Sequence, residues 1–263
     1  MSDASSPGGC PSADIVLRAT GLVKSFAGFV AVNDVDLAVR RGSIHALIGP
    51  NGAGKTTCFN LLTRFLAPTS GRIHFGDRDI TRAGPAEVAR RGLCRTFQIS
   101  SIFPQHSVLQ NVRLALQIRR RVSSAFWRSS RSLAALDGRA DELLAMVGLT
   151  DVRDRPAGRL AYGQRRILEL AITLALDPEV MLLDEPLAGV GREDIDRICD
   201  VIRMAVRTST VVMVEHNLKA VSRLADTITV LARGRVIAEG DYRTVSADPQ
   251  VRAAYIGDEG HEL

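Results

Sequence analysis

The sequence predicts an α/β fold in which a mixed, largely parallel sheet carries an antiparallel N-terminal β subdomain and an inserted helical subdomain. Two continuous apolar runs, Val180–Leu183 and Thr210–Val214, each end in polar residues, as central parallel strands buried on both faces do. A glycine-rich turn follows the strand pattern Ser43–Ile48. The stretch 109–147 has helical spacing and no strand pattern, which indicates the inserted helices.

Local patterns predict the other elements. Alternating apolar residues indicate strands, and apolar residues at helical spacing indicate a helix after the glycine-rich turn. The segments are strands at Ile15–Leu17, Val35–Val39 and Arg72–Phe75, a helix at Thr56–Phe65, and a hairpin of Thr227–Leu231 with Val236–Ala238. We place the helical subdomain at about 100–178 inside one domain of residues 14–257, and we expect residues 1–13 and 258–263 to be tails, the first of them disordered.

Composition fits an ordinary globular domain, because 46% of the 263 residues are hydrophobic and 24% are charged. The first dozen residues lack the basic start and apolar stretch of a signal peptide, so a cytoplasmic location is expected. No window reaches the roughly 20 apolar residues of a membrane-spanning helix, so a transport role requires separate membrane subunits. The cysteines, Cys10, Cys58, Cys94 and Cys199, are too irregularly spaced for a zinc site or a disulfide framework, and we interpret them as reduced thiols.

The strongest motif is a phosphate-binding loop between a predicted strand and a predicted helix. It comprises Gly49, Pro50, Asn51, Gly52, Ala53, Gly54, Lys55, Thr56 and Thr57. Glycines let backbone N–H groups converge on phosphate oxygens, and the helix N-terminus adds a positive dipole. Lys55 can reach the β and γ phosphates, and the Thr56 hydroxyl can ligate Mg²⁺. We therefore expect a P-loop NTPase core that binds ATP; the alternative is a glycine-rich turn with a surface lysine.

Further polar residues fit the hydrolysis of a phosphoanhydride. Asp184 can hold Mg²⁺ while the adjacent Glu185 orients or deprotonates an attacking water. Two strand-end acids that cap a turn are the alternative. His216 follows the next strand and could contact the γ-phosphate and Glu185, and the Gln98 amide could touch both Mg²⁺ and the attacking water. Taken alone, neither His216 nor Gln98 would stand out.

A segment before another predicted helix decides between families. Leu160, Ala161, Tyr162, Gly163 and Gln164 resemble the signature segment of ABC transporter ATPases, normally Leu-Ser-Gly-Gly-Gln. From about Leu17 to Gly257 the chain resembles the nucleotide-binding subunit of an ABC transporter. The resemblance implies that the signature segment caps the γ-phosphate of ATP bound to the opposite subunit. The roles it implies are an adenine platform for Phe26, coupling to the membrane partner for Gln98, metal binding for Asp184, the catalytic base for Glu185 and the switch histidine for His216.

Two positions depart from the family pattern, and a third leaves the identity of the adenine platform open. Ala161 replaces the usual signature serine, so one hydroxyl contact to the partner's γ-phosphate is absent, while backbone N–H groups and the helix dipole remain. Gly191 stands where most of the family has an aspartate that crosses the dimer interface, which leaves communication between the two ATP sites open. Phe29 is a second candidate for the adenine platform, and we expect one of Phe26 and Phe29 to lie in the core.

Within this family, the chain is most similar to the ATP-binding subunits of branched-chain amino acid importers. The segments that carry the similarity are Phe26–Asn33, Arg95–Gln98, Leu160–Arg166, Glu215–Asn217, Asp248–Val251 and Ala254–Gly257. The resemblance implies a subunit at the cytoplasmic face of the inner membrane. Its implied partners are two different permeases, a periplasmic binding protein that acts indirectly, and a second ATPase. A heterodimer is expected, with a homodimer as the alternative.

Other functions stay open at this point. An ABC transporter for urea, an amide or a lipid would share all of this chemistry. A soluble ABC ATPase that acts on DNA or the ribosome would fit the formal charge of +5, but the chain has neither a second ATPase domain nor a coiled-coil or zinc insertion, so no nucleic-acid partner is expected. A regulatory ATPase with poor turnover would fit Ala161 and Gly191, but Lys55, Asp184, Glu185 and His216 argue against it. The basic stretch Arg119–Arg121 fits a solvated helix face better than a lipid contact.

Overall fold

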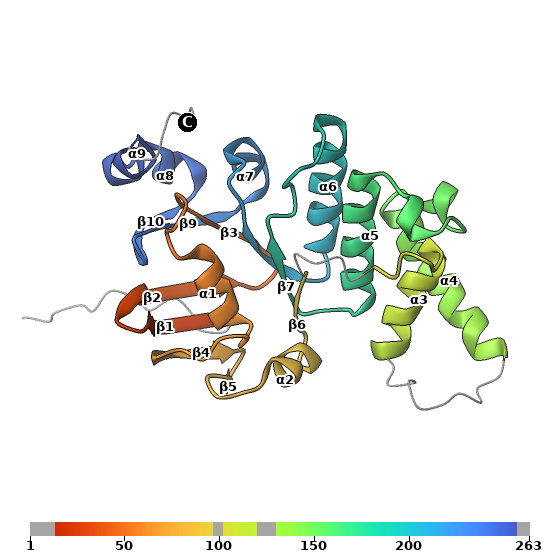
Figure 1. Cartoon of the computed structure of the whole chain (residues 1–263), viewed down its shortest axis with the longest axis horizontal. Coiled ribbons are helices and arrows are strands. Elements are labelled where there is room, and N and C mark those ends of the chain that lie inside the picture. The colour runs from red at the N-terminus through yellow and green to blue at the C-terminus, as the bar shows by residue number, and fades with distance from the viewer. Residues whose placement is uncertain (1–13, 97–101, 120–129, 257–263) are drawn as a thin grey trace, which may run out of the picture.

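The computed structural model describes residues 14–96, 102–119 and 130–256, and its strands form two sheets. A six-stranded sheet has the order β10-β9-β3-β8-β7-β6 (Figure 1). Its strands are β3 (Ile44–Ile48), β6 (Leu93–Arg95), β7 (Val180–Asp184), β8 (Thr210–Val214), β9 (Thr227–Ala232) and β10 (Arg235–Gly240). All pairs from β9 through β6 are parallel, and β10 joins β9 as an antiparallel hairpin.

The centre of this sheet is buried on both faces. Every residue of β3, β7 and β8 is buried, which explains why these strands have continuous apolar sequences and no alternation. Parallel neighbours direct their carboxyl ends to the same edge, so the loops after β3, β8 and β7 lie next to one another.

A second sheet is antiparallel and has the order β2-β1-β4-β5. It contains β1 (Ile15–Phe26), β2 (Phe29–Arg40), β4 (Ser70–Phe75) and β5 (Arg78–Asp79). The inner faces of β1, β2 and β4 pack with α1 (Lys55–Leu62) and with one face of the central strands in a shared apolar core. This sheet is the predicted antiparallel β subdomain.

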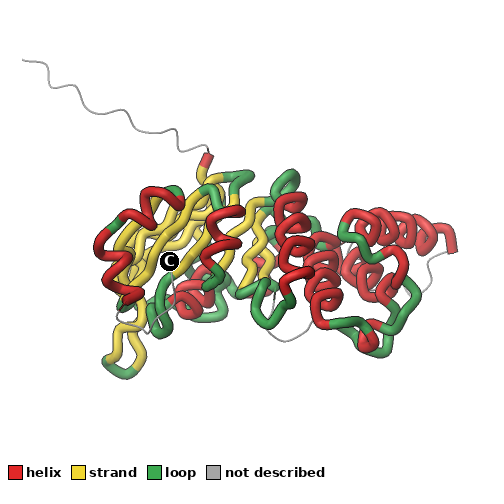
Figure 2. The backbone as a smooth tube through the Cα atoms, turned by 90° about the horizontal axis from the view of Figure 1, so that it is seen from above, coloured by secondary structure: helices red, strands yellow, loops and turns green. Residues whose placement is uncertain are grey.

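Helices α3, α4 and α5 gather at the end of the molecule opposite the antiparallel sheet, whereas α8 and α9 pack on β10 (Figures 1 and 2). Contacts tie α3 to both α4 and α5, and α5 also packs on α6. Besides α1, the helices of the described chain are α2 (Pro85–Arg90), α3 (Val108–Arg119), α4 (Ser130–Met146), α5 (Tyr162–Ala175), α6 (Arg192–Ala205), α7 (Leu218–Leu224), α8 (Tyr242–Ala247) and α9 (Pro249–Ile256), with short 3₁₀ turns at Thr150–Val152 and Ala157–Arg159. None of the helices in the described ranges is long and apolar enough to cross a membrane.

The predicted fold class is confirmed, with differences in detail. β8 has the predicted bounds, whereas β1 extends to Phe26, well beyond the expected Ile15–Leu17. Exposed and half-buried residues such as Lys24 hide this strand from a search for alternating apolar residues, but pairing with both β2 and β4 stabilises it. The expected helix Thr56–Phe65 is shorter, because α1 ends at Leu62 and the chain then turns through Arg64 at positive φ.

The described cysteines are buried thiols, as predicted. Cys58, Cys94 and Cys199 form no disulfide. Burial raises the pKa of Cys58 to about 12 and that of Cys94 to about 11, so both stay protonated and unreactive near neutral pH. Cys10 lies outside the described residues.

A buried histidine makes the stability of this fold depend on pH. His45 on β3 is 1% exposed, and its Nε2 lies 2.8 Å from the Thr229 hydroxyl on β9. That hydroxyl donates to Glu239 at 2.6 Å, so Nε2 of His45 carries a hydrogen and donates to Thr229. Burial lowers the pKa of His45 from 6.5 to about 4.

We expect the free energy of unfolding to fall by about 2 kcal/mol between pH 7 and pH 5 through this group. The sign follows because the neutral imidazole favours the folded state: the contribution is complete above pH 6.5 and is lost as the pH falls towards 4. Urea unfolding at both pH values checks it, with His45→Gln as the comparison. An equal pH dependence in the wild type and the variant would contradict the assignment.

Candidate active site

The phosphate loop, Asp184, Glu185 and His216 lie at one edge of the central sheet. The phosphate loop follows β3, His216 follows β8, and Asp184 ends β7. Val214 on β8 is paired with both Leu47 of β3 and Asp184 of β7 in the parallel register. The phosphate loop, Asp184 and His216 are far apart in the sequence but therefore lie side by side at the ends of neighbouring strands.

Glycines shape the phosphate loop between β3 and α1. Gly49, Gly52 and Gly54 have φ angles of 148°, 76° and 100°, which side chains rarely adopt. A Cβ atom on Gly54 would lie 2.5 Å from the Ala31 carbonyl oxygen of β2. The loop is thus closely packed against β2, and its backbone conformation requires glycine at positions 49, 52 and 54.

Lys55 begins α1 and folds back over the loop. Its Nζ donates to the carbonyl oxygens of Gly49 at 2.7 Å and Pro50 at 2.9 Å, and the residue is 9% exposed. The adjacent Thr56 is exposed. A buried ammonium at the helix N-terminus, next to an exposed hydroxyl, can serve phosphate oxygens and a metal ion respectively.

An arginine holds Asp184 at the end of β7. Arg95 on β6 donates to Asp184 Oδ2 at 2.5 Å, with the two side chains 10% and 1% exposed. Arg95 also donates to Asn60 of α1 at 2.5 Å and lies over the ring of Phe59. The pair links β6, β7 and α1 in one buried contact. The sequence pattern alone does not single out Arg95, because the contact joins residues distant in the chain.

The second oxygen of Asp184 fits a metal ligand. Oδ1 is buried and accepts no hydrogen bond from any residue of the described chain. An orphaned carboxylate oxygen is costly, and coordination to a divalent cation would satisfy it. No cluster of three or more His, Cys, Asp or Glu side chains suited to a metal occurs in the described ranges, so the cation would share its ligands with phosphate and water.

The backbone fixes Glu185 and His216. Glu185 has a φ of 48°, its N–H donates to the Val214 oxygen at 3.0 Å, and its carbonyl accepts from Ala188 at 3.1 Å. His216 is exposed at the end of β8, and Asn217 behind it caps α7 by accepting from Ala220 at 3.1 Å. A half-buried carboxylate and an exposed imidazole at adjacent strand ends can orient a water against a phosphate bound to the loop.

Both candidate adenine platforms are exposed. Phe26 and Phe29 are paired across the hairpin turn of β1 and β2, and they are 42% and 69% exposed. The expectation that one of them lies in the core is wrong, because the tight turn at Ala27 and Gly28, both at positive φ, places the two rings beyond the apolar core. Lys24 Nζ lies 5.0 Å from the Phe26 ring centre.

The signature segment begins α5, in the helical part of the molecule, whereas the phosphate loop begins α1 beside the antiparallel sheet (Figure 1). Gln164 accepts from the Ala161 N–H at 3.2 Å. The Tyr162 hydroxyl donates to the Ala188 oxygen at 3.1 Å and accepts from Arg166 at 2.9 Å. Tyr162 thus ties the signature segment to the segment after Glu185. Gln98 lies outside the described residues.

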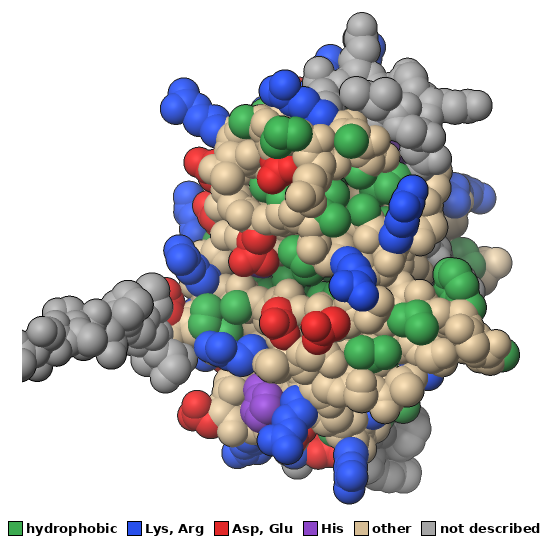
Figure 3. All heavy atoms as spheres, turned by 90° about the vertical axis from the view of Figure 1, so that its left-hand side faces the viewer, with side chains coloured by type: hydrophobic (Ala, Val, Ile, Leu, Met, Phe, Trp, Pro, Cys, Tyr) green, Lys and Arg blue, Asp and Glu red, His purple; other side chains and the backbone are tan. Residues whose placement is uncertain are grey.

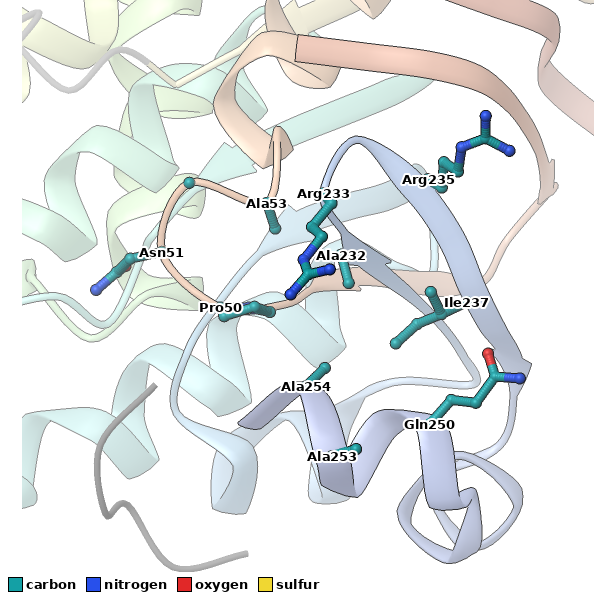
Figure 4. Close-up of a pocket in the computed structure, with 11 residues that line it drawn as sticks. Pro50, Asn51, Ala53, Ala232, Arg233, Arg235, Ile237, Gln250, Ala253 and Ala254 are labelled. Carbon is teal, nitrogen blue, oxygen red and sulfur yellow. The ribbon is translucent and has the colours of Figure 1, made fainter. Parts of the chain in front are cut away.

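A hollow of about 630 Å³ lies beside the phosphate loop (Figure 4). The loop, the β9–β10 hairpin and α9 line it, and Arg233 and Arg235 are its basic members. Burial raises the pKa of Tyr255 on α9 to about 12, and the backbone of Gly49 in the phosphate loop acts on this pKa in the opposite direction. The C-terminal helices therefore form part of the surroundings of the loop.

On the face seen in Figure 3, basic and acidic side chains are interspersed.

Comparison with known proteins identifies the family. A model described as ABC transporter matches residues 32–188. The high-affinity branched-chain amino acid transport ATP-binding protein BraF of Pseudomonas aeruginosa is 35% identical over 253 residues, which are 92% of this chain and 98% of the relative. This chain belongs to the ABC transporter family.

Other relatives of this ABC transporter subunit agree. LivG of Escherichia coli K12, named as a high-affinity branched-chain amino acid transport ATP-binding protein, is 36% identical, again over 92% of this chain and 98% of its own length. A model described as branched-chain amino acid ATP-binding cassette transporter matches residues 235–261. The solved ADP conformation of an ABC transporter's ATP-binding cassette aligns with a TM-score of 0.79 and 32% identity, over 92% of this chain and 99% of that one. The chain is an ATP-binding and ATP-hydrolysing ABC subunit.

Proposed function

We propose that this ABC subunit hydrolyses MgATP at the carboxyl edge of β3, β8 and β7. The meeting of the phosphate loop, Asp184-Glu185 and His216 at that edge is the observation that carries the proposal. The loop amides and Lys55 bind the phosphates, Glu185 takes a proton from the attacking water, and His216 contacts the γ-phosphate. Phe26 stacks on adenine, which its 42% exposure at the β1–β2 turn supports.

Mg²⁺ is assigned to Thr56, Asp184 and Gln98. The exposed Thr56 hydroxyl and the orphaned Asp184 Oδ1 support this assignment. A bound Mg²⁺ neutralises the charge that develops on the β and γ phosphates. Arg95 stays on the other oxygen of Asp184 and so keeps Oδ1 directed away from the ion pair.

A second ATPase subunit completes the site. The signature segment Leu160–Gln164 would cap ATP bound to that subunit, because it presents a helix N-terminus away from its own phosphate loop. The exposed Tyr162 at this position supports a surface that another chain covers. A heterodimer with a sister ATPase is our assignment, and a homodimer is the alternative.

The proposed cargo is a branched-chain amino acid, imported through two permease subunits with a periplasmic binding protein upstream. Similarity to BraF and LivG over 92% of the chain supports this cargo, and so does the match over 235–261. A groove of about 360 Å³ between β6, α3 and α5 supports a permease contact, since its residues Phe103 and Ile118 are 56% and 66% exposed. The subunit would then lie peripherally on the cytoplasmic face of the inner membrane.

Uptake of radiolabelled leucine tests the proposal in cells that lack this chain. Uptake restored by the intact chain, but not by Glu185→Gln at equal abundance, is the expected result. Excess unlabelled isoleucine and valine should compete, whereas urea and acetamide should not. Equal uptake in all three strains would refute the assignment of branched-chain amino acids, and competition by urea or acetamide alone would redirect it to those substrates.

A further inference from the structure

A buried carboxylate without an assigned role lies beside the proposed catalytic groups. Glu215 follows the last residue of β8 and is 0% exposed. Its Oε1 accepts from the Leu187 N–H at 2.8 Å, and its Oε2 faces the His216 and Asn217 N–H groups at 3.2 and 3.4 Å. One side chain therefore binds the backbone of two different loops.

These two loops carry the proposed base and the proposed γ-phosphate sensor. Leu187 lies two residues after Glu185, and His216 directly follows Glu215. The Glu185 N–H already donates to the Val214 oxygen at 3.0 Å, so the Glu215–Leu187 contact is a second bond between the same strand ends. These two bonds, one at the Glu185 N–H and one two residues later, hold the backbone after β7 against the end of β8.

A charged acceptor is suited to this place. Burial raises the pKa of Glu215 above its usual value, and the N–H groups of Leu187 and Asn217 and the neighbouring His216 oppose that rise. Hydrogen bonds to an ionised acceptor are stronger than those to a neutral one, and a carboxylate accepts at both oxygens. A neutral amide at this position would accept at one oxygen and turn an NH₂ group towards N–H donors.

We propose that Glu215 is a positioning residue that holds the loop after Glu185 and the loop of His216 as one unit, so that base and sensor keep a fixed separation during turnover. The proposal rests on the catalytic roles given above to Glu185 and His216. We expect Glu215 to position only these two loops. The phosphate loop lies between β3 and α1, and its carbonyl oxygens accept hydrogen bonds from Lys55.

Two variants distinguish the effect of the Glu215 carboxylate charge from the effect of its side-chain length. Glu215→Gln keeps the shape but loses one acceptor, and Glu215→Asp keeps both acceptors but is one methylene shorter. Glu239→Gln is the control, because Glu239 also accepts a hydrogen bond from a neighbouring strand, from Thr229 at 2.6 Å, but is exposed and lies on the edge strand β10.

The test uses the full chain together with the subunits that assemble with it. We expect kcat for ATP to fall at least about tenfold in both Glu215 variants, while KM and the affinity for a fluorescent ATP analogue stay within about twofold. Amide hydrogen exchange should accelerate in peptides that cover 185–190 and 215–218 but not in the phosphate loop. Glu239→Gln should match the wild type in all of these measurements.

Other results would overturn the proposal. An unchanged kcat would show that the two loops need no such link. Faster exchange throughout the chain with loss of nucleotide affinity would show a role in general stability alone. If the catalytic role of Glu185 were wrong, Glu185→Gln would show full turnover. The amide hydrogen exchange of the Glu215 variants does not depend on that role, so the two failures can be told apart.

Discussion

Replacing Glu185 by glutamine is expected to lower ATP turnover by at least about a hundredfold, which is the usual contribution of a general base. The amide has the same shape as the carboxylate but takes no proton from water. The backbone around it should persist, because the bonds to Val214 and Ala188 involve main-chain atoms only. ATP binding should therefore stay within about twofold of the wild type.

Phosphate release and binding of a fluorescent ATP analogue, measured on the same preparations, check this prediction. Glu142→Gln is a suitable control, since Glu142 is a 66% exposed acid on α4 paired with Arg139. The control should hydrolyse ATP at the wild-type rate. Turnover by Glu185→Gln at that same rate would remove Glu185 as the base.

Replacing Gly49 by alanine is expected to abolish nucleotide binding, with a loss of affinity of more than about a hundredfold. A Cβ atom at this position would lie 2.1 Å from the Leu231 carbonyl oxygen of β9, and Gly49 has a φ of 148°. The obstacle is backbone within the central sheet, so the loop must move instead. That movement would displace the amides that converge on phosphate and the carbonyl that receives Lys55.

Titration with a fluorescent ATP analogue and thermal unfolding together test the Gly49 prediction. Gly84→Ala is the matched control, because Gly84 has a φ of −80° and a Cβ there meets no atom within 4 Å. The control should bind ATP normally. Normal affinity in folded Gly49→Ala would contradict the proposed contact between the phosphate loop and β9.

The fold was predictable where a segment's own pattern decides its structure. β8 is a continuous apolar run bounded by polar residues, and the structure gives it the predicted bounds. β6 has three residues, too few for a periodic signal, and its pairing with β7 defines it. α8 and α9 are also too short for a clear helical spacing of apolar residues. Their contacts with β9, β10 and one another define them instead.

The candidate site was predictable as a set of motifs but not as a set of contacts. Lys55, Asp184 and Glu185 stand out because each occupies a recognisable place at or after the end of a strand, and His216 gains its role from the family resemblance. Arg95 and Glu215 do not, because their importance comes from partners across the sheet, Asp184 in one case and Leu187 in the other. Such pairs depend on strand order, which no local pattern specifies.

The most direct test is an experimental structure of the Glu185→Gln form with ATP and Mg²⁺, assembled with its partner ATPase. The account predicts phosphates held by Lys55 and the loop amides, the metal on Thr56 and Asp184 Oδ1, and His216 at the γ-phosphate. It also predicts that the partner's signature segment closes over the nucleotide. Phosphates bound in the hollow at Arg233, or a metal away from Asp184, would contradict it.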